Sequence, residues 1–152
     1  MSKINSSDFI NIMNERGFIH QITDKANLKK EMITTSTVGY IGFDCTAPSL
    51  HVGSLIQIMM LRWFQKTGNK PIVLMGGGTT KVGDPSGKDS ARPLLSSEKI
   101  QFNKENIKTI FEKFLKFGEY NNDAIIVDNE DWLENLHYIS FLRDYGPYFS
   151  VN

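Results

Sequence analysis

The stretch YIGFDCTAPSLHVGSL, residues 40–55, decides the fold. An apolar run over residues 38–43 predicts a buried strand, and the turn-rich residues 44–50 predict a loop. The next segment, residues 52–67, has the length and composition of a helix, and Gly68 ends it. This helix has few polar positions, so most of its circumference should be covered. A strand, a loop and a helix in this order begin a βαβ unit.

The rest of the chain continues the alternation of strands and helices. Residues 71–75, PIVLM, predict a second strand, and residues 124–127, AIIV, predict a third. Between them lie an eighteen-residue loop without periodicity, residues 76–93, and a helix over residues 97–117. Continuous apolar strands separated by helices favour an α/β fold, a Rossmann-like parallel sheet with helices on both faces. The crossovers should be right-handed.

Shorter helices flank this predicted sheet. Apolar residues recur at helical spacing up to Gly17, a weaker pattern covers residues 24–32, and a last helix is predicted over residues 138–144. We therefore expect an N-terminal helical segment over residues 1–37 and an α/β unit over residues 38–152. Ligands of such folds collect at the carboxyl ends of the strands, where the loops after the three predicted strands should meet.

Composition excludes some function classes and leaves others open. Lysine plus arginine and aspartate plus glutamate both number 17, so no bulk charge attracts nucleic acid or an anionic membrane. The single cysteine, Cys45, rules out an internal disulfide and fits a reducing compartment. The N-terminus lacks the apolar core of a signal peptide, and no apolar stretch is long enough to span a membrane. We therefore expect a cytoplasmic protein with no membrane partner.

The glycine-rich segment after the second predicted strand does not match a phosphate-binding motif. Gly78 and Gly83 have the glycine spacing of a P-loop, but Asp84 and Pro85 occupy the positions of its lysine and hydroxyl residue. The dinucleotide motif also fails, because Lys81 stands where its third glycine belongs. The segment needs another explanation.

His51 stands at the first turn of a predicted helix, where free backbone N–H groups favour an anion. Gly53 allows another group to approach the backbone closely, and Ser54 lies on the same helical face as His51. A bound phosphate would explain all three. The alternative is that His51 only caps the helix and Gly53 is a packing glycine.

The stretches YIGFDCTAPSLHVGS and GDPSGK resemble the tyrosyl-tRNA synthetases, a class I aminoacyl-tRNA synthetase family. HVGS stands where that class has its HIGH signature, and the resemblance continues through DNEDWL and FLRDYGPYFSVN, over about residues 4–152. The resemblance implies the first half of a class I nucleotide-binding fold. Ser54 replaces the final histidine of HIGH, so we expect altered ATP contacts rather than their loss.

The resemblance also implies a function. It is ATP-dependent activation of L-tyrosine to tyrosyl-adenylate, followed by transfer to tRNA(Tyr), in a homodimer. Mg²⁺ would travel with ATP, and neither a protein metal site nor a tightly bound cofactor is expected. No stretch matches the KMSKS loop, so we expect an N-terminal fragment, truncated near the start of the dimer-interface insertion and complete only with a C-terminal half. The alternatives are a stand-alone nucleotide- or tyrosine-binding module, an inactive remnant, and an unrelated nucleotidyltransferase.

The motifs of the resemblance assign residues to three groups. The tyrosine-binding residues would be Tyr40, which bonds the substrate phenol, Asp84, which pairs with its ammonium group, Thr79 and Asn129. The ATP-binding residues would be Gly42, Asp44, Cys45, Thr46, His51, Gly53 and Ser54. The catalytic residues would be Thr46, His51 and Ser54, which contact the reacting phosphates, and Lys88 and Arg92, which grip the departing pyrophosphate.

Several of these residues also have a purely structural reading. Tyr40 could be a buried strand tyrosine, Asp84 a turn residue, and Asn129 a packing residue. Lys88 and Arg92 could be solvated on a polar loop. The lysines of residues 97–117, Lys104 among them, alternate with glutamates and predict a solvated helix face.

Overall fold

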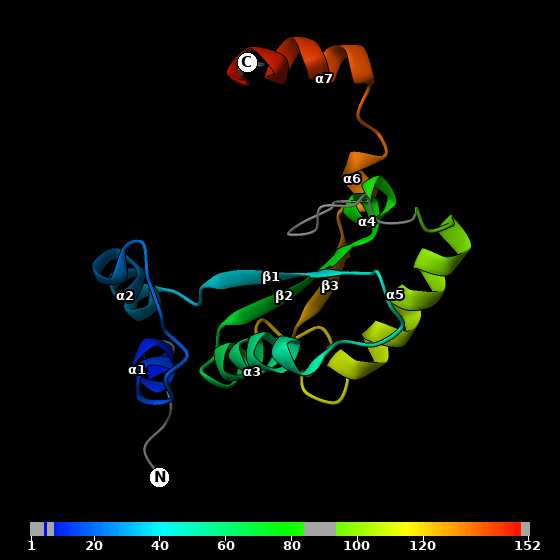
Figure 1. Ribbon diagram of the computed structural model, residues 1–152. Helices are drawn as coiled ribbons and strands as arrows, with labels where there is room; N and C mark the ends of the chain where they lie inside the picture. The colour runs from blue at the N-terminus through cyan, green and yellow to red at the C-terminus, as the bar shows by residue number, and fades with distance from the viewer. Residues whose placement is uncertain (1–4, 6–7, 84–93, 150–152) are drawn as a thin grey trace.

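The computed structural model describes residue 5, residues 8–83 and residues 94–149 of the chain. Three parallel strands form one sheet in the order β1-β2-β3, and helices flank it (Figure 1). The strands are β1 (Val38–Asp44), β2 (Lys70–Gly76) and β3 (Ile125–Asp128). The α/β fold with a parallel sheet is therefore confirmed.

Seven α-helices and a short 3₁₀ helix are found in the described residues. They are α1 (Asp8–Glu15), α2 (Lys25–Thr34), α3 (Val52–Lys66), α4 (Gly77–Val82), α5 (Ser97–Phe111), α6 (Glu130–Leu133), α7 (Tyr138–Tyr145) and η1 (Gly146–Tyr148). Every helix predicted from the sequence is present. The single-turn helix α6 was not predicted, because four residues are too few for a helical period to show.

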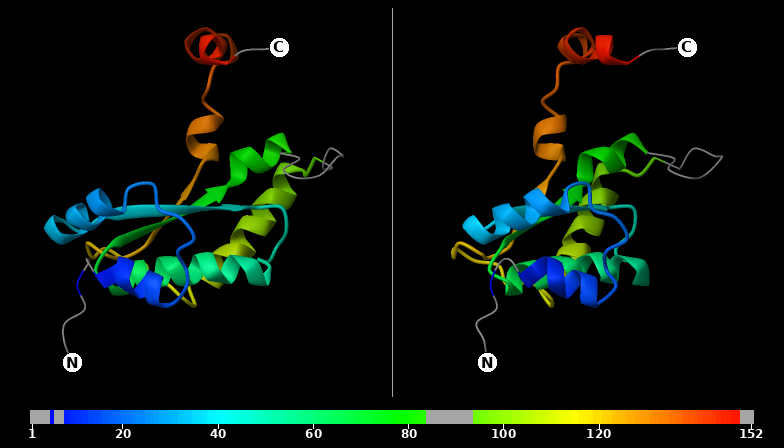
Figure 2. Two further views of the ribbon diagram at one scale, coloured as in Figure 1. Left: turned by 60° about the vertical axis from the view of Figure 1, so that its left-hand side comes forward. Right: turned by 90° about the vertical axis from the view of Figure 1, so that its left-hand side faces the viewer.

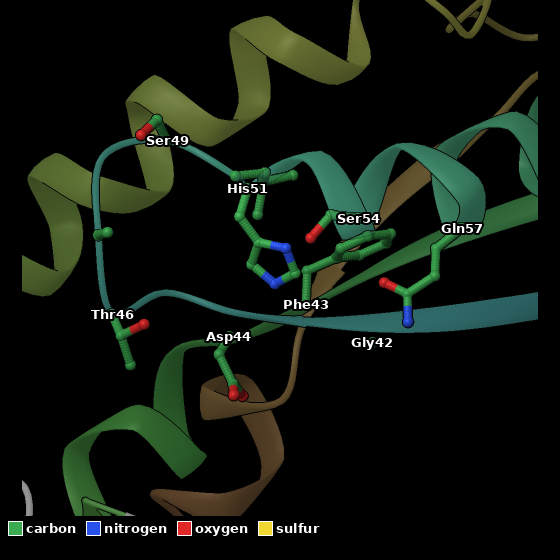
Figure 3. Close-up of a pocket in the computed structure, with 10 residues that line it drawn as sticks. Gly42, Phe43, Asp44, Thr46, Ser49, His51, Ser54 and Gln57 are labelled. Carbon is green, nitrogen blue, oxygen red and sulfur yellow. The ribbon is translucent and has the colours of Figure 1, made fainter.

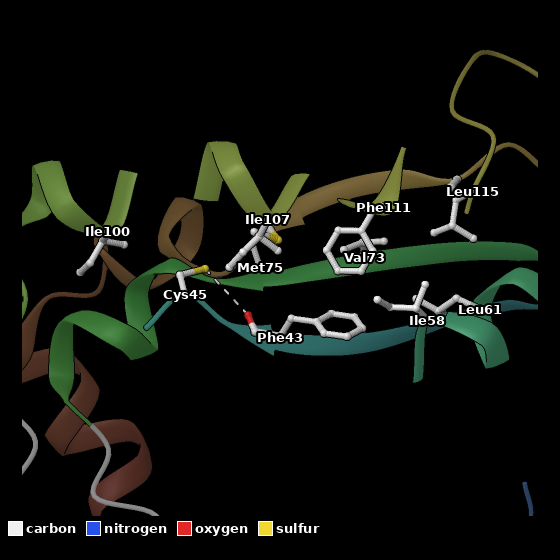
Figure 4. Close-up of a cluster of buried hydrophobic side chains, with 11 residues drawn as sticks. Phe43, Cys45, Ile58, Leu61, Val73, Met75, Ile100, Ile107, Phe111 and Leu115 are labelled. Carbon is white, nitrogen blue, oxygen red and sulfur yellow. Dashed lines mark hydrogen bonds between the residues drawn. The ribbon is translucent and has the colours of Figure 1, made fainter. Parts of the chain in front are cut away.

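The main core lies between the sheet and two helices on the same face. Ile58 of α3 and Ile107 and Phe111 of α5 pack with Phe43 and Val73 of the sheet (Figure 4). The Phe43 and Phe111 rings meet edge to face, with centroids 4.7 Å apart. Since the strands follow one another across the sheet in a single direction, right-handed crossovers place both helices on this face.

Strand β1 is not the buried strand that its apolar run predicts. It lies at an edge of the described sheet, and only Phe43 among its residues is buried. Side chains alternate between the two faces of a strand, so Val38 and Tyr40 point away from α3 and α5. Their exposed fractions are 58% and 68%. The prediction failed because a run of apolar residues does not show whether both faces of a strand are covered.

Helix α3 is covered over less of its circumference than predicted. Ile58 and Leu61 are buried, but Val52, Leu55 and Ile56 are exposed in its first turns. The exposed side chains lie beside the carboxyl end of the sheet, so part of the apolar surface of α3 is left free there.

Polar side chains of α3 determine where α5 ends. The Gln65 carboxamide donates to the Lys116 carbonyl (2.6 Å) and accepts from the Lys116 N–H (2.9 Å). Arg62 donates to the Phe114 carbonyl (2.6 Å). These bonds hold the chain in a turn after Phe111, whereas the sequence predicts a helix up to residue 117.

The N-terminal helices and the C-terminal helix differ in how they are attached. Ile10 of α1 and Met32 of α2 form a second small core with Phe64 of α3, and Figure 2 shows α1 lying along α3. Helix α7 has no buried residue and stands apart from the sheet (Figures 1 and 2). None of the described helices combines the length and apolar character needed to cross a membrane.

The packing of Phe111 predicts that the substitution Phe111→Ala will destabilise the fold. Phe111 is completely buried, so the change removes its ring contacts and leaves a cavity, at a cost of about 3–5 kcal/mol in the free energy of unfolding. Urea unfolding followed by circular dichroism measures this. Phe102→Ala is the matched control, because Phe102 lies on the same helix and is half exposed. Equal losses in the two variants would contradict the assigned core.

Candidate functional site

Three segments meet at the carboxyl edge of the sheet, as the parallel topology predicts. They are the loop after β1, helix α4 directly after β2, and the Asp128-Asn129 pair at the end of β3 (Figure 1). Hydrogen bonds join the three segments to one another. The site is therefore built from parts far apart in the sequence.

A cavity of about 560 Å³ opens between the loop after β1 and the start of α3 (Figure 3). Its lining residues are Gly42, Phe43, Asp44, Thr46, Ala47, Ser49, Leu50, His51, Ser54 and Gln57. Five of the predicted ATP-site residues, Gly42, Asp44, Thr46, His51 and Ser54, are among them. The volume lies in the usual range of small-molecule sites.

Two further polar residues of this cavity were not predicted. Gln57 follows Ser54 by three residues on α3, so helical spacing alone could have indicated it. Ser49 lies in the irregular loop, where no periodicity shows which way a side chain points.

His51 both caps α3 and lines the cavity. Its Nδ1 atom accepts a hydrogen bond from the Gly53 N–H (3.0 Å), which places the proton of the neutral ring on Nε2. The Ser54 N–H donates to the His51 carbonyl (3.0 Å). These two amides are thus occupied, and the prediction that first-turn amides are free for an anion is wrong for both. The imidazole is the group left to face a ligand.

Gly53 is required by the His51 ring itself. A Cβ at this position would lie 2.8 Å from His51 Cε1. The close approach predicted for Gly53 is therefore confirmed, but the approaching group is the capping histidine. The cap and the cavity wall are the same structural feature.

The described lining of the cavity carries little charge. Asp44 contributes a carboxylate and His51 an imidazole, and none of the lining residues is a lysine or arginine. The predicted cations Lys88 and Arg92, and the predicted ammonium partner Asp84, lie outside the described residues.

Cys45 faces the core rather than the cavity. Its side chain is completely buried in the main apolar cluster (Figure 4). Burial, together with the charge of Asp128, raises the pKa of the thiol to about 11. A thiol that stays protonated is a poor nucleophile, so Cys45 contributes to packing here.

Two of the predicted tyrosine-site residues lie together and a third does not. Asn129 donates from Nδ2 to Thr79 Oγ1 (3.1 Å), and its Oδ1 accepts from the Gly78 N–H (2.8 Å). Tyr40 extends from the middle of β1, with no hydrogen bond to either residue among those described. The buried-tyrosine reading of Tyr40 is wrong, while Asn129 does have a structural role in holding α4.

The glycine-rich segment begins as a helix, not as part of an irregular loop. Asp128 Oδ1 accepts from the Gly77 N–H (3.0 Å), and Asn129 Oδ1 accepts from the Gly78 N–H. Side chains at the end of β3 and directly after it thus pair two amides at the start of α4. A Cβ on Gly77 would lie 2.5 Å from Asp128 Oδ1. The glycines therefore allow these side chains to approach the backbone of α4. This packing role explains the glycines without a phosphate-binding motif.

Lys104 is part of an ion-pair network and not of a solvated face. Its Nζ atom contacts Asp128 Oδ2 (2.7 Å) and Glu130 Oε2 (2.8 Å), and Lys81 pairs with the other oxygen of Glu130. Partial burial disfavours the charged lysine, but the hydrogen bonds to both carboxylates outweigh it and raise the pKa of Lys104. Hydrogen bonds from Lys104 and Lys81 lower the pKa of Glu130. The network ties α4, α5 and α6 together.

Residues 32–152 match the sequence profile of the family described as tRNA synthetases class I (W and Y). The tyrosine–tRNA ligase of Beijerinckia indica is 63% identical over 147 residues, and that of Rhodospirillum rubrum is 58% identical over 146 residues. These matches cover 97% and 96% of this chain. In each case they span 35% of the relative's length, so the chain corresponds to about a third of these proteins.

Solved structures show the same similarity in three dimensions. A C-terminally truncated mitochondrial tyrosyl-tRNA synthetase of Aspergillus nidulans superposes with a TM-score of 0.79 at 27% identity, over 95% of this chain and 43% of that one. The corresponding enzyme of Coccidioides posadasii gives a TM-score of 0.74 at 26% identity, over 94% of this chain and 41% of that one.

The lowered pKa of Glu130 predicts an acid-sensitive contribution to stability. A carboxyl whose pKa falls on folding stabilises the fold above its ordinary value of 4.5, and this stabilisation is lost as the pH falls through the folded-state pKa. Glu130→Gln should therefore lower the free energy of unfolding near neutral pH and flatten its decrease in acid. Urea unfolding of both proteins between about pH 7 and pH 3 measures this. Parallel pH profiles would contradict the assigned network.

Proposed function

The chain belongs to the class I tRNA synthetases of the tryptophan and tyrosine family, and we propose that it forms the first part of the catalytic domain of a tyrosine–tRNA ligase. The observation that carries the proposal is the convergence of Asp44, Thr46, His51 and Ser54 on one cavity at the carboxyl edge of the sheet. The tyrosine–tRNA ligases of Beijerinckia indica and Rhodospirillum rubrum, at 63% and 58% identity, support the tyrosine branch.

The proposed reaction has two steps. The carboxylate of L-tyrosine attacks the α-phosphorus of Mg·ATP, the bond to the bridging oxygen breaks, and pyrophosphate leaves. A hydroxyl of the terminal adenosine of tRNA(Tyr) then attacks the carbonyl carbon of tyrosyl-adenylate, and AMP leaves. The tyrosine carboxylate is already ionised, so the first step needs no general base. What it needs is charge stabilisation and alignment.

We propose that the cavity holds the phosphates and ribose of ATP. The Nε2–H of His51 and the hydroxyls of Thr46 and Ser54 can donate to phosphate oxygens as negative charge develops there. Asp44 carries charge of the same sign as a phosphate, so it suits a hydroxyl or ammonium donor instead. Because the described lining lacks lysine and arginine, Lys88 and Arg92 are the proposed partners of pyrophosphate.

We propose that tyrosine lies along β1 between Asp44 and Tyr40. Residues four apart share a face of the strand and are separated by about 13 Å, enough for a tyrosine molecule. Gly42 lies between them on the same face and leaves space for the ligand. The exposed Tyr40 would bond the substrate phenol, and Asp84 would bind the ammonium group. Asn129 would act through Thr79 and α4.

The family resemblance supports further parts of the proposal. Residues 38–152 would be the first half of the Rossmann-like fold, and residues 1–37 a helical support packed on α3. The enzyme would be cytoplasmic and would act as a homodimer, with the remaining contacts to tyrosine, ATP and tRNA(Tyr) made by parts corresponding to the rest of the relatives.

Tyrosine-dependent ATP–pyrophosphate exchange tests the proposed function. We expect exchange when this chain replaces the matching third of the Beijerinckia indica enzyme, and a loss of about 100-fold when that chimaera carries His51→Ala, because a phosphate donor is removed. A folded but inactive chimaera, or equal exchange with His51→Ala, would contradict the proposal. The chain alone is tested in parallel, by calorimetry for the binding of tyrosine and ATP and by the same exchange assay for activity. Binding without exchange would favour a stand-alone binding module.

Gly42→Val should separate ligand binding from folding. A Cβ at Gly42 would meet only Leu74, at 3.9 Å, so the fold tolerates it, but the added methyl groups would occupy the space proposed for tyrosine. We expect the KM for tyrosine in the exchange assay of the chimaera to rise about tenfold or more, with unchanged circular dichroism. Gly146→Val is the control, because a Cβ there meets no atom within 4 Å and Gly146 lies outside the proposed tyrosine path. An unchanged KM for tyrosine would exclude the proposed path along β1.

A further inference from the structure

The loop after β1 is held by two helices that contribute nothing to the cavity lining. The Cys45 N–H donates to Thr80 Oγ1 of α4 (3.1 Å), and the Cys45 carbonyl accepts from Asn103 Nδ2 of α5 (2.8 Å). Thr80 is 6% exposed, and Cys45 and Asn103 are completely buried. Both polar groups of one residue's backbone are thus paired by side chains from elsewhere in the chain.

This pair of bonds is the main polar attachment of the loop. The ladder between β1 and β2 ends at the pair of Asp44 and Gly76, and α3 begins only after its cap His51. Between these points, no other backbone hydrogen bond of the loop is found within the described part of the chain. Leu50 packs on the core near the far end of the loop. Asp44 is held by the ladder, but the position of Thr46, which follows Cys45, depends on the bonds at Cys45.

Asn103 is an energetically unfavourable residue for its position, because it places a polar side chain in the apolar core. It lies on the same face of α5 as Ile100 and Ile107, which belong to the main core. Its Oδ1 atom is buried and has no hydrogen-bond partner among the described residues. An apolar side chain would fill the place without burying Oδ1, but it would leave the buried Cys45 carbonyl without its donor. The hydrogen bond to Cys45 is the contact that only a donor at this position can make.

We propose that Asn103 and Thr80 are positioning residues for ATP binding. They clamp the backbone of Cys45 and so hold Thr46 at the cavity. The role in ATP binding rests on the proposed function. Neither residue touches the ligand. Their effect is transmitted through one peptide at the end of β1. The clamp itself is a property of the described structure and can be tested without any ligand.

The single cysteine reports on the clamp directly. Reaction of the Cys45 thiol with 5,5′-dithiobis-(2-nitrobenzoic acid) requires the loop to open, because Cys45 is fully buried. We expect Asn103→Leu and Thr80→Val each to raise the rate of this reaction about tenfold at low urea concentration. The rate should depend little on the urea concentration, because a local opening of the loop exposes little surface. The urea midpoint of Asn103→Leu should change little, because one unpaired buried acceptor, Asn103 Oδ1, is exchanged for another, the Cys45 carbonyl.

Asn106→Leu is the matched control. Asn106 lies on the same helix but donates only to the Phe102 carbonyl within α5, so Cys45 should react at the parent rate in this variant. The clamp is overturned if Asn103→Leu and Thr80→Val both react at the parent rate. It is also overturned if the rise in the reaction rate of each variant is fully accounted for by a fall in its urea midpoint of global unfolding. Thr80→Val decides the question if Asn103→Leu does not fold.

Calorimetry with Mg·ATP then tests the positioning role. We expect the Kd for ATP to rise about tenfold in Asn103→Leu and to stay unchanged in Asn106→Leu. If the parent chain alone binds no ATP, the Kd is compared in the chimaera with the Beijerinckia indica enzyme, while the thiol reaction still decides whether the clamp exists. A chimaera that also binds no ATP would contradict the proposed function. If the clamp variants react faster yet bind ATP as tightly as the parent, the positioning role is wrong.

Discussion

Backbone groups just beyond the carboxyl ends of the strands are buried, and each has to find a hydrogen-bond partner. The ladder between β1 and β2 ends at Asp44 and Gly76, so the hydrogen bonds to the backbone beyond this pair come from side chains. Thr80 and Asn103 pair the Cys45 peptide, and Asp128 and Asn129 pair the first amides of α4. The placement of the loop after β1, of α4 and of the cavity between loop and helix follows from these few bonds.

The same constraint gives the small residues at this edge a physical meaning. Side chains can reach the amides of α4 only because Gly77 and Gly78 have no Cβ in the way, and the His51 ring can fold onto its own helix only over Gly53. Asp128 and Glu130 at this edge are in turn paired with Lys104 and Lys81. Asp44, the carboxylate that lines the proposed phosphate site, has no ion pair among the described residues, so its charge stays available for a hydroxyl or ammonium donor.

Much of this could be predicted from the sequence, because periodicity, helix stops and the parallel topology are local or follow from local elements. The three strands, the crossover helices and the meeting of loops at one edge are of this kind, and so is the cavity around His51 and Ser54. The predictions that failed concern features that depend on residues far away in the sequence. The exposure of Tyr40 depends on what covers the face of β1 turned away from α3 and α5. The end of α5 depends on Gln65, and the pairing of Lys104 on carboxylates more than twenty residues away.

The order of the strands in space is the same as their order in the chain. Each new strand therefore pairs with the strand made just before it, through a crossover helix that is already part of the growing segment. No strand has to be inserted between two others, so this part of the sheet can assemble from the N-terminus as the ribosome releases it. Val38 pairs with Lys70 and Ile72 with Ile125, so each pairing closes a loop of more than thirty residues, but the entropic cost of closure rises only slowly with loop length.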